Sequence, residues 1–168
     1  MALTFACTAN YLKNYLWLRK RVVFGENFMR IAVLGAGLMG PTIAMDCIES
    51  DEVEEVLLID IDKGRLDNVA ENLGKSLKLK TLVQDVTDRH GLVESLRGYD
   101  VATIALLRWL NVEAMWSAIE AAVDIIDLSG PPREDWEEIN KAAKKAVITI
   151  IPGCGAVSYT HLTLPTNR

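Results

Sequence analysis

The sequence predicts an α/β fold in which helices cover both faces of a doubly wound parallel sheet. Two patterns lead to this prediction. Short apolar runs alternate with segments of helical periodicity along most of the 168 residues, as they do in successive βαβ units. A glycine-rich turn over residues 35–40 joins the first apolar run to the first helical segment. With 50% hydrophobic and 24% charged residues, the chain has enough apolar material for one domain core.

Each expected strand is a short apolar run. The six runs are 30–34, 56–60, 80–84, 100–106, 124–128 and 146–151. The expected helices are 38–49, 63–77, 89–96, 111–122 and a segment from the Pro131-Pro132 turn through Lys145. Asp88 and Asn111 are expected to cap the third and fourth of these helices. Six strands with such crossovers predict a Rossmann sheet in the order 3-2-1-4-5-6.

Charge and composition exclude several classes of function. The chain has 18 Lys and Arg against 23 Asp and Glu, a net charge of −5, so a nucleic-acid partner is not expected. No apolar run is long enough to cross a membrane. Three widely spaced cysteines, Cys7, Cys47 and Cys154, indicate reduced thiols and a cytoplasmic location, and two histidines without partner ligands argue against a metal site.

Both ends of the chain look foreign to the expected domain, 29–156. Residues 1–28 are interpreted as a non-native or flexible extension, because Met29 directly precedes the first strand; a basic amphipathic anchor is the alternative. Residues 157–168 contain VSYTHLTLPT, which resembles a translated sequencing adapter, and an ordinary threonine-rich coil is the alternative. We therefore expect a truncated chain.

The turn Gly35-Ala36-Gly37-Leu38-Met39-Gly40 is a GxGxxG motif between a strand and a helix. Gly35 permits the tight turn, Gly37 lets the backbone approach a pyrophosphate, and Gly40 allows close packing of the helix on the strand. Phosphate oxygens would then bind N–H groups at the positive end of the helix dipole. The motif predicts a dinucleotide-binding site.

Asp60 ends the second expected strand, 20 positions beyond Gly40, where a carboxylate accepts hydrogen bonds from the ribose hydroxyls of an adenosine. A carboxylate repels a 2′-phosphate, so NAD is expected rather than NADP. Asp60 or Asp62 could instead be a simple helix cap. Flavin and methyl-donor proteins remain alternatives, because they use similar turns. Asp85 and Val86 end the third strand and would flank the adenine, or form a turn that leads into a helix.

These residues together resemble the saccharopine dehydrogenase-like oxidoreductases, in particular the lysine 6-dehydrogenase-like proteins. The resemblance covers about 29–156 and includes RIAVLGAGLMG, IDIDKGRLDNV, QDVTD, GYDV, IDLSG and VITIIPGCGAV. It implies an NAD(P)-dependent oxidoreductase acting on CH-NH or CH-NH2 groups of a small amino-acid-type substrate. It also implies a second, catalytic domain that provides dimerisation and is absent here.

Carried over to this sequence, the resemblance implies that Leu38 and Met39 amides hold the pyrophosphate and that Ala105 and Leu106 line the path to nicotinamide. Ile104 departs from the family, where an Asn often stands. No catalytic residue is assigned. Asp127 and Cys154 are the nearest acid or base candidates, with a turn-forming and a packing role as alternatives. The sequence favours an inactive dinucleotide-binding fragment of an oxidoreductase; a stand-alone binding or sensory module is the alternative.

Overall fold

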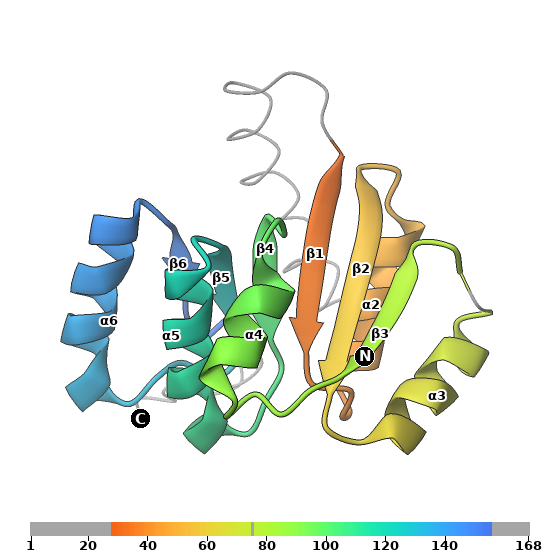
Figure 1. The fold of residues 1–168 in the computed structure, drawn as a ribbon, viewed down its shortest axis with the longest axis horizontal. Coiled ribbons are helices and arrows are strands. Elements are labelled where there is room, and N and C mark those ends of the chain that lie inside the picture. Colours follow the sequence, from red (N-terminus) through yellow and green to blue (C-terminus); the bar gives the residue numbers. More distant parts are fainter. Residues whose placement is uncertain (1–27, 75, 156–168) are drawn as a thin grey trace, which may run out of the picture.

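The computed structural model describes residues 28–74 and 76–155, which form a six-stranded parallel sheet flanked by helices (Figure 1). The strand order is β3-β2-β1-β4-β5-β6, so the predicted Rossmann order is confirmed. The strands are β1 (Met29–Leu34), β2 (Val53–Asp60), β3 (Leu79–Val83), β4 (Val101–Ile104), β5 (Asp124–Asp127) and β6 (Ile150–Ile151). The expected extension at 1–28, Phe28 aside, and the expected tail at 157–168 lie outside the described residues.

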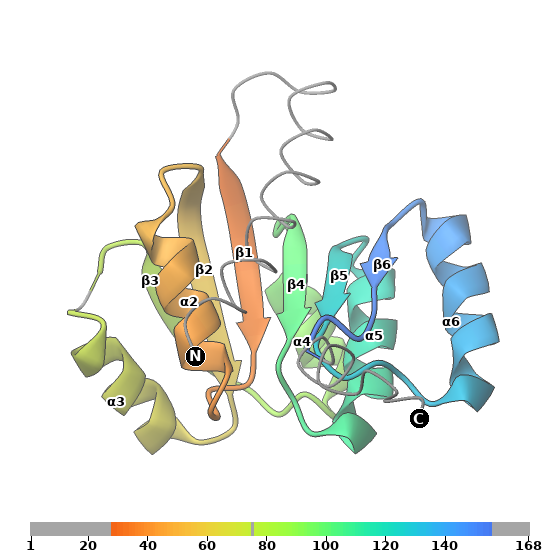
Figure 2. The same ribbon diagram turned by 180° about the vertical axis from the view of Figure 1, so that it is seen from behind.

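Helices cover both faces of the sheet, as the two opposite views show (Figures 1 and 2). On one face lie α4 (Arg89–Leu96), α5 (Asn111–Glu120) and α6 (Arg133–Ala146). On the other lie α2 (Gly40–Glu49) and α3 (Lys63–Asn72). A short 3-10 helix, Arg108–Leu110, precedes α5.

Alternate residues of each central strand supply two separate cores. In β1, Ala32 and Leu34 pack with the α4–α6 layer, whereas Ile31 and Val33 pack with the α2–α3 layer. This alternation follows from the period of two along a strand. Both layers are thus bound to the sheet by apolar burial, and the carboxyl ends of the strands meet at one common edge.

Two expected boundaries differ most from the structure. The helix expected over 63–77 ends at Asn72, because Gly74 takes a left-handed conformation with φ of +68°. The strand expected over 146–151 is reduced to Ile150–Ile151, because α6 continues to Ala146 and Val147 turns the chain with φ of +59°. In both cases the position of a helix end set the boundary. The pattern of apolar residues does not show where a helix ends.

One of the two expected caps is confirmed. The Asp88 side chain accepts a hydrogen bond from Gly91 N at the start of α4. The cap expected at Asn111 was wrong, because the residue before α5 is Leu110 and Asn111 lies inside the helix. Its amide points into the protein toward the end of β5.

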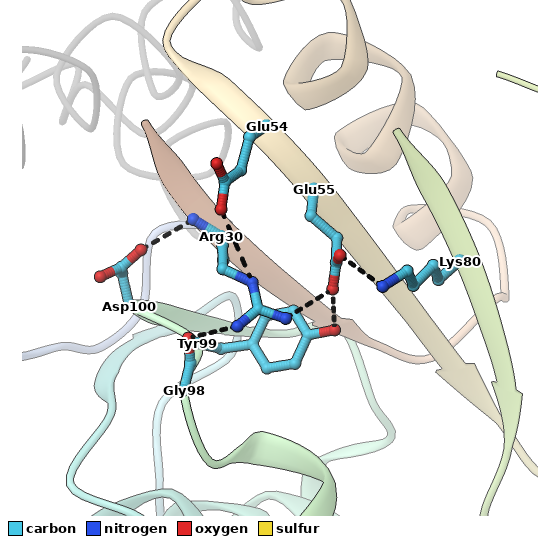
Figure 3. A network of polar contacts seen from close by, with 7 residues as sticks. All are labelled: Arg30, Glu54, Glu55, Lys80, Gly98, Tyr99 and Asp100. Atoms are coloured by element: carbon cyan, nitrogen blue, oxygen red, sulfur yellow. Dashed lines mark hydrogen bonds and ion pairs between the residues drawn. The ribbon is translucent and has the colours of Figure 1, made fainter. Parts of the chain in front are cut away.

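The amino edge of the sheet carries a closed polar network (Figure 3). Glu55 of β2 accepts hydrogen bonds from Arg30 Nη2 at 2.9 Å and Tyr99 Oη at 2.5 Å, and Lys80 Nζ lies 2.5 Å from its second oxygen. The Arg30 guanidinium lies 4.8 Å from the centre of the Tyr99 ring. Asp100 accepts from Arg30 N at 2.7 Å. These contacts connect β1, β2, β3 and the start of β4 at the edge opposite the glycine turn.

Candidate functional site

The glycine turn lies between β1 and α2, at the point where the strand order reverses between β1 and β4. Open parallel sheets bind ligands in the crevice at this point. Gly35 has φ of +103°, and a Cβ there would lie 2.6 Å from the carbonyl oxygen of Ala105. A Cβ at Gly40 would overlap the carbonyl oxygen of Gly35. Both positions therefore require glycine for the turn to close.

Gly37 is different, because a Cβ built on it meets nothing within 4 Å. Protein packing does not explain glycine here, whereas a ligand approaching the backbone would. Within the described residues, no protein acceptor bonds the N–H groups of Gly37, Leu38 and Met39. These amides lead into α2, whose dipole favours negative charge at this end. The turn thus has the geometry of a phosphate-binding site.

Asp60 connects the end of β2 to this turn. Its carboxylate accepts from Ala36 N at 2.7 Å through one oxygen and from Asp62 N at 2.8 Å through the other. The residue is only 7% exposed. Each carboxylate oxygen has a second lone pair, so Asp60 can still accept a hydrogen bond from a ligand hydroxyl. The structure therefore brings Asp60 and the glycine turn together, as the spacing predicts.

The capping alternative applies to Asp62 and not to Asp60. The Asp62 side chain accepts from Arg65 N in the first turn of α3, and Asp62 is the N-cap residue of that helix. Asp60 lies before the helix at the end of the strand. The two acids of the IDID segment thus have separate places, one facing the glycine turn and one capping a helix.

Asp85 and Val86 follow β3 at the same edge. Asp85 is exposed, and the backbone N–H and the hydroxyl of Thr87 both donate to it, which lowers the pKa of its carboxyl group. The Val86 side chain is buried in the core beneath α4. Gln84 N donates to Asp60 O at 3.1 Å, so this segment adjoins the end of β2. Of the two residues, only Asp85 presents a side chain to solvent.

Ala105 and Leu106 follow β4 and lie against the glycine turn. Ala105 N donates to Leu34 O at 2.9 Å, and Leu106 Cδ2 would lie 3.2 Å from a Cβ on Gly35. Both residues are partly exposed. They continue the surface from the glycine turn toward β5.

Exposed apolar side chains flank this edge. Ile61 is 65% exposed directly after β2, Leu38 is 95% exposed in the glycine turn, and Leu107 and Trp109 are exposed after β4. Large apolar groups in water on one edge are typical of a ligand or interaction surface. Their position after strand ends is the signal in the sequence that could have identified them.

The surroundings of Asp127 and Cys154, the acid or base candidates, favour a structural role over a catalytic one. Asp127 is fully buried, and its carboxylate accepts from Ser129 N, Gly130 N and Asn111 Nδ2. Burial raises the pKa of Asp127. Burial, together with the negative charge of Asp127, also raises the pKa of the Cys154 thiol, which opposes thiolate formation. Asp127 thus forms the turn after β5, and Cys154 is partly buried beside it.

Neither a membrane-spanning helix nor a metal-binding cluster is found among the described residues. No helix among them is both long and apolar enough to cross a membrane. No group of three or more His, Cys, Asp or Glu side chains in residues 28–74 and 76–155 is arranged to hold a metal ion.

The fold and the glycine turn define the class: a nucleotide-binding Rossmann domain of the kind found in oxidoreductases. Residues 31–151 match the family model of the saccharopine dehydrogenase NADP-binding domain. The chain belongs to this family and is an NAD(P)-binding domain of a saccharopine dehydrogenase-like oxidoreductase.

One curated relative and two solved structures are similar to this chain over the same domain. The chain is 26% identical over 136 residues to carboxyaminopropylagmatine dehydrogenase from Synechocystis sp., covering 75% of this chain and 34% of that protein. The fold is similar to apo saccharopine dehydrogenase (L-Glu forming) from Saccharomyces cerevisiae, with a TM-score of 0.63, 23% identity, and coverage of 74% and 27%. It is also similar to scyllo-inositol dehydrogenase from Lactobacillus casei with NAD(H), with a TM-score of 0.62, 16% identity, and coverage of 76% and 36%. The chain spans about a third of the length of these proteins.

Proposed function

We propose that this chain binds NAD in preference to NADP through the glycine turn and Asp60. The observation that carries the proposal is the position of Asp60, whose buried carboxylate accepts from Ala36 N beside the turn. A ribose placed next to this turn would offer its hydroxyl protons to a fixed negative charge. A 2′-phosphate would bring further negative charge to the same place, which is unfavourable at low local dielectric.

Nearby cations do not reverse this preference. Lys63 Nζ lies 2.6 Å from Asp67 Oδ2, and Arg65 Nε lies 3.5 Å from Asp62 Oδ2. Each cation after β2 is thus already paired with an acid of α3 or its cap. A 2′-phosphate would have to compete with these carboxylates as well as with Asp60. The family model is described as NADP-binding, so a preference for NAD would distinguish this chain within its family.

The residues suit a dinucleotide in other respects. Gly37, Leu38 and Met39 would hold the pyrophosphate, Asp85 would flank the adenine, and Ala105 and Leu106 would line the path to nicotinamide. A nicotinamide cofactor supplies hydride transfer when bound, and the protein supplies its orientation. From the family, we propose a reaction at a nitrogen-bearing carbon of a small amino-acid-type substrate.

No residue of this chain is proposed as the catalytic acid or base. The Asp127 carboxylate is occupied by the backbone N–H groups of the turn that follows it, and the raised pKa of Cys154 disfavours a thiolate. The part of this chain that matches these relatives covers only about a third of their length. We propose that substrate contacts and dimerisation reside in the portion of such proteins that this chain does not match.

Calorimetric titration of the full chain with NAD and NADP tests the proposal. We expect NAD to bind more tightly, and Asp60→Ala to weaken NAD about tenfold or more while affecting NADP less, because a hydrogen bond to a charged acceptor is lost. Asp51→Ala is the matched control, since it removes an exposed acid before β2 at the opposite edge. Tighter binding of NADP, or equal losses in the two Asp variants, would reject the proposal.

A further inference from the structure

A buried amide and a buried carboxylate lie beneath the carboxyl ends of β4 and β5. Asn111 and Asp127 are both fully buried. Asn111 Nδ2 donates to Asp127 Oδ1 at 2.8 Å and to Ser129 Oγ at 2.7 Å. Nothing in the glycine turn or around Asp60 requires this pair, so its role must be sought at the end of β5.

The Asn111 amide is held in an orientation that leaves its buried carbonyl oxygen without a hydrogen bond. Among buried side-chain atoms of the described residues, Asn111 Oδ1 is the one that lacks a hydrogen-bond partner. Buried polar atoms are nearly always paired, so an exception calls for an explanation. Both N–H groups of the amide serve acceptors at the end of β5, and the carbonyl is left without a donor. The fold therefore orients the Asn111 amide so that its N–H groups face Asp127 and Ser129, although its carbonyl oxygen is left without a hydrogen bond.

This orientation determines what Ser129 can offer. Ser129 is exposed, and its oxygen accepts from Asn111, so its hydroxyl proton points away from that bond. No residue of 28–74 or 76–155 accepts that proton. The Asp127 carboxylate also holds the turn that carries Ser129, because Ser129 N and Gly130 N both donate to it. Ser129 is thus a prepared hydrogen-bond donor on a rigid turn.

Backbone hydrogen bonds connect this turn to the proposed cofactor site. Gly35 lies against Ala105, Leu128 N donates to Ile104 O at 3.2 Å, and Ser129 follows Leu128. With Asp60 on the β2 side of the glycine turn holding the adenosine, the other half of a dinucleotide would extend along β4 and β5. Ala105 and Leu106 offer no polar side chain on this route, whereas Ser129 does.

We propose that Ser129 is a ligand of the nicotinamide riboside half of the cofactor, and that Asn111, anchored on Asp127, is the positioning residue that orients its hydroxyl. This inference rests on the proposed function. The group that it binds is an uncharged acceptor, either the carboxamide oxygen or a hydroxyl of the distal ribose.

Titration of the full chain with NAD, ADP-ribose and ADP tests the proposal, because only NAD carries nicotinamide and ADP lacks both distal groups. We expect Ser129→Ala to weaken NAD about three- to tenfold, the effect of one neutral hydrogen bond, and to leave ADP unchanged. A parallel loss for ADP-ribose assigns the contact to the distal ribose; no loss assigns it to the carboxamide. Ser95→Ala is the matched control, since Ser95 lies in α4 and bonds Gly91 O.

Asn111→Ala tests the positioning role by the same comparison. We expect it to weaken NAD relative to ADP, whereas a merely structural effect would weaken both ligands alike. Unchanged NAD binding in Ser129→Ala, or equal losses of NAD and ADP in both variants, would overturn the proposal. Failure of the unmodified chain to bind any of the three ligands would instead reject the proposed function. If the unmodified chain prefers NADP, the comparison is made with NADP and 2′,5′-ADP.

Discussion

Replacing Glu55 by Gln removes the charge at the centre of the network that joins the amino ends of the strands (Figure 3). Burial alone would raise the pKa of Glu55, but hydrogen bonds from Lys80, Tyr99 and Arg30 outweigh it and lower that pKa to about 2. For Tyr99 the shift is upward: burial and the hydrogen bond to Glu55 raise the pKa of its hydroxyl to about 12, although Arg30 opposes this shift. The folded state therefore strongly favours the ionised carboxylate.

The size of the effect follows from the difference between the folded and unfolded states. A glutamate pKa of about 2 against an ordinary 4.5 corresponds to about 3 kcal/mol of folding free energy at neutral pH. The Lys80 side chain is 60% exposed and that of Arg30 is 36% exposed, so solvent screens both cations. We therefore expect Glu55→Gln to lower the free energy of unfolding by about 1–2 kcal/mol.

The stabilisation has a defined pH dependence. Because the folded pKa is lower than the unfolded one, the contribution of Glu55 is complete above pH 4.5 and is lost as the pH falls toward 2. Urea unfolding, followed by circular dichroism at several pH values, measures this for the original chain and for Glu55→Gln. The gap between them should narrow as the pH falls. Glu138→Gln, an exposed position in α6, is the control. A gap that stays constant with pH, or no gap near neutrality, would refute this account of the network.

Three further substitutions follow from the geometry of the carboxyl edge. Gly37→Ala should leave the melting temperature unchanged and weaken dinucleotide binding, because its Cβ meets no protein atom but would occupy the proposed phosphate position; calorimetry with thermal melting checks this. Gly40→Ala should lower both, since its Cβ overlaps Gly35 O, and an unchanged melting temperature would contradict the packing role. Asp127→Ala should lower the free energy of unfolding by about 3 kcal/mol in urea titration, because it leaves the buried Asn111 amide and two backbone N–H groups without their acceptor; a loss below about 1 kcal/mol would count against this.

Strand order and the meeting of Asp60 with the glycine turn were predictable from the sequence. Both depend on local patterns: apolar runs separated by helical segments, and a fixed spacing between a glycine turn and a strand-end acid. The topology of parallel crossovers then leaves few arrangements. Element ends were less predictable, because left-handed residues such as Gly74 and Val147 end helices irrespective of apolar periodicity.

The Asn111 and Ser129 contacts could not be predicted in the same way. Asn111 has the residue type and the position of a helix cap, but Leu110 precedes the helix and the amide turns inward to an acid sixteen positions away. Such a contact depends on how α5 packs over β5, which no local pattern reports. The burial of Val86 likewise follows from the packing of α4 and not from its place after a strand.

Backbone amide NMR signals of the full chain, followed during titration with NAD, would show whether a dinucleotide lies across the glycine turn. We expect the largest shifts at Gly37, Leu38 and Met39, with smaller ones near Asp60 and none at Gly98 on the opposite edge of the sheet. Absence of any shift at saturating NAD, or shifts concentrated around Gly98 and Tyr99, would contradict it.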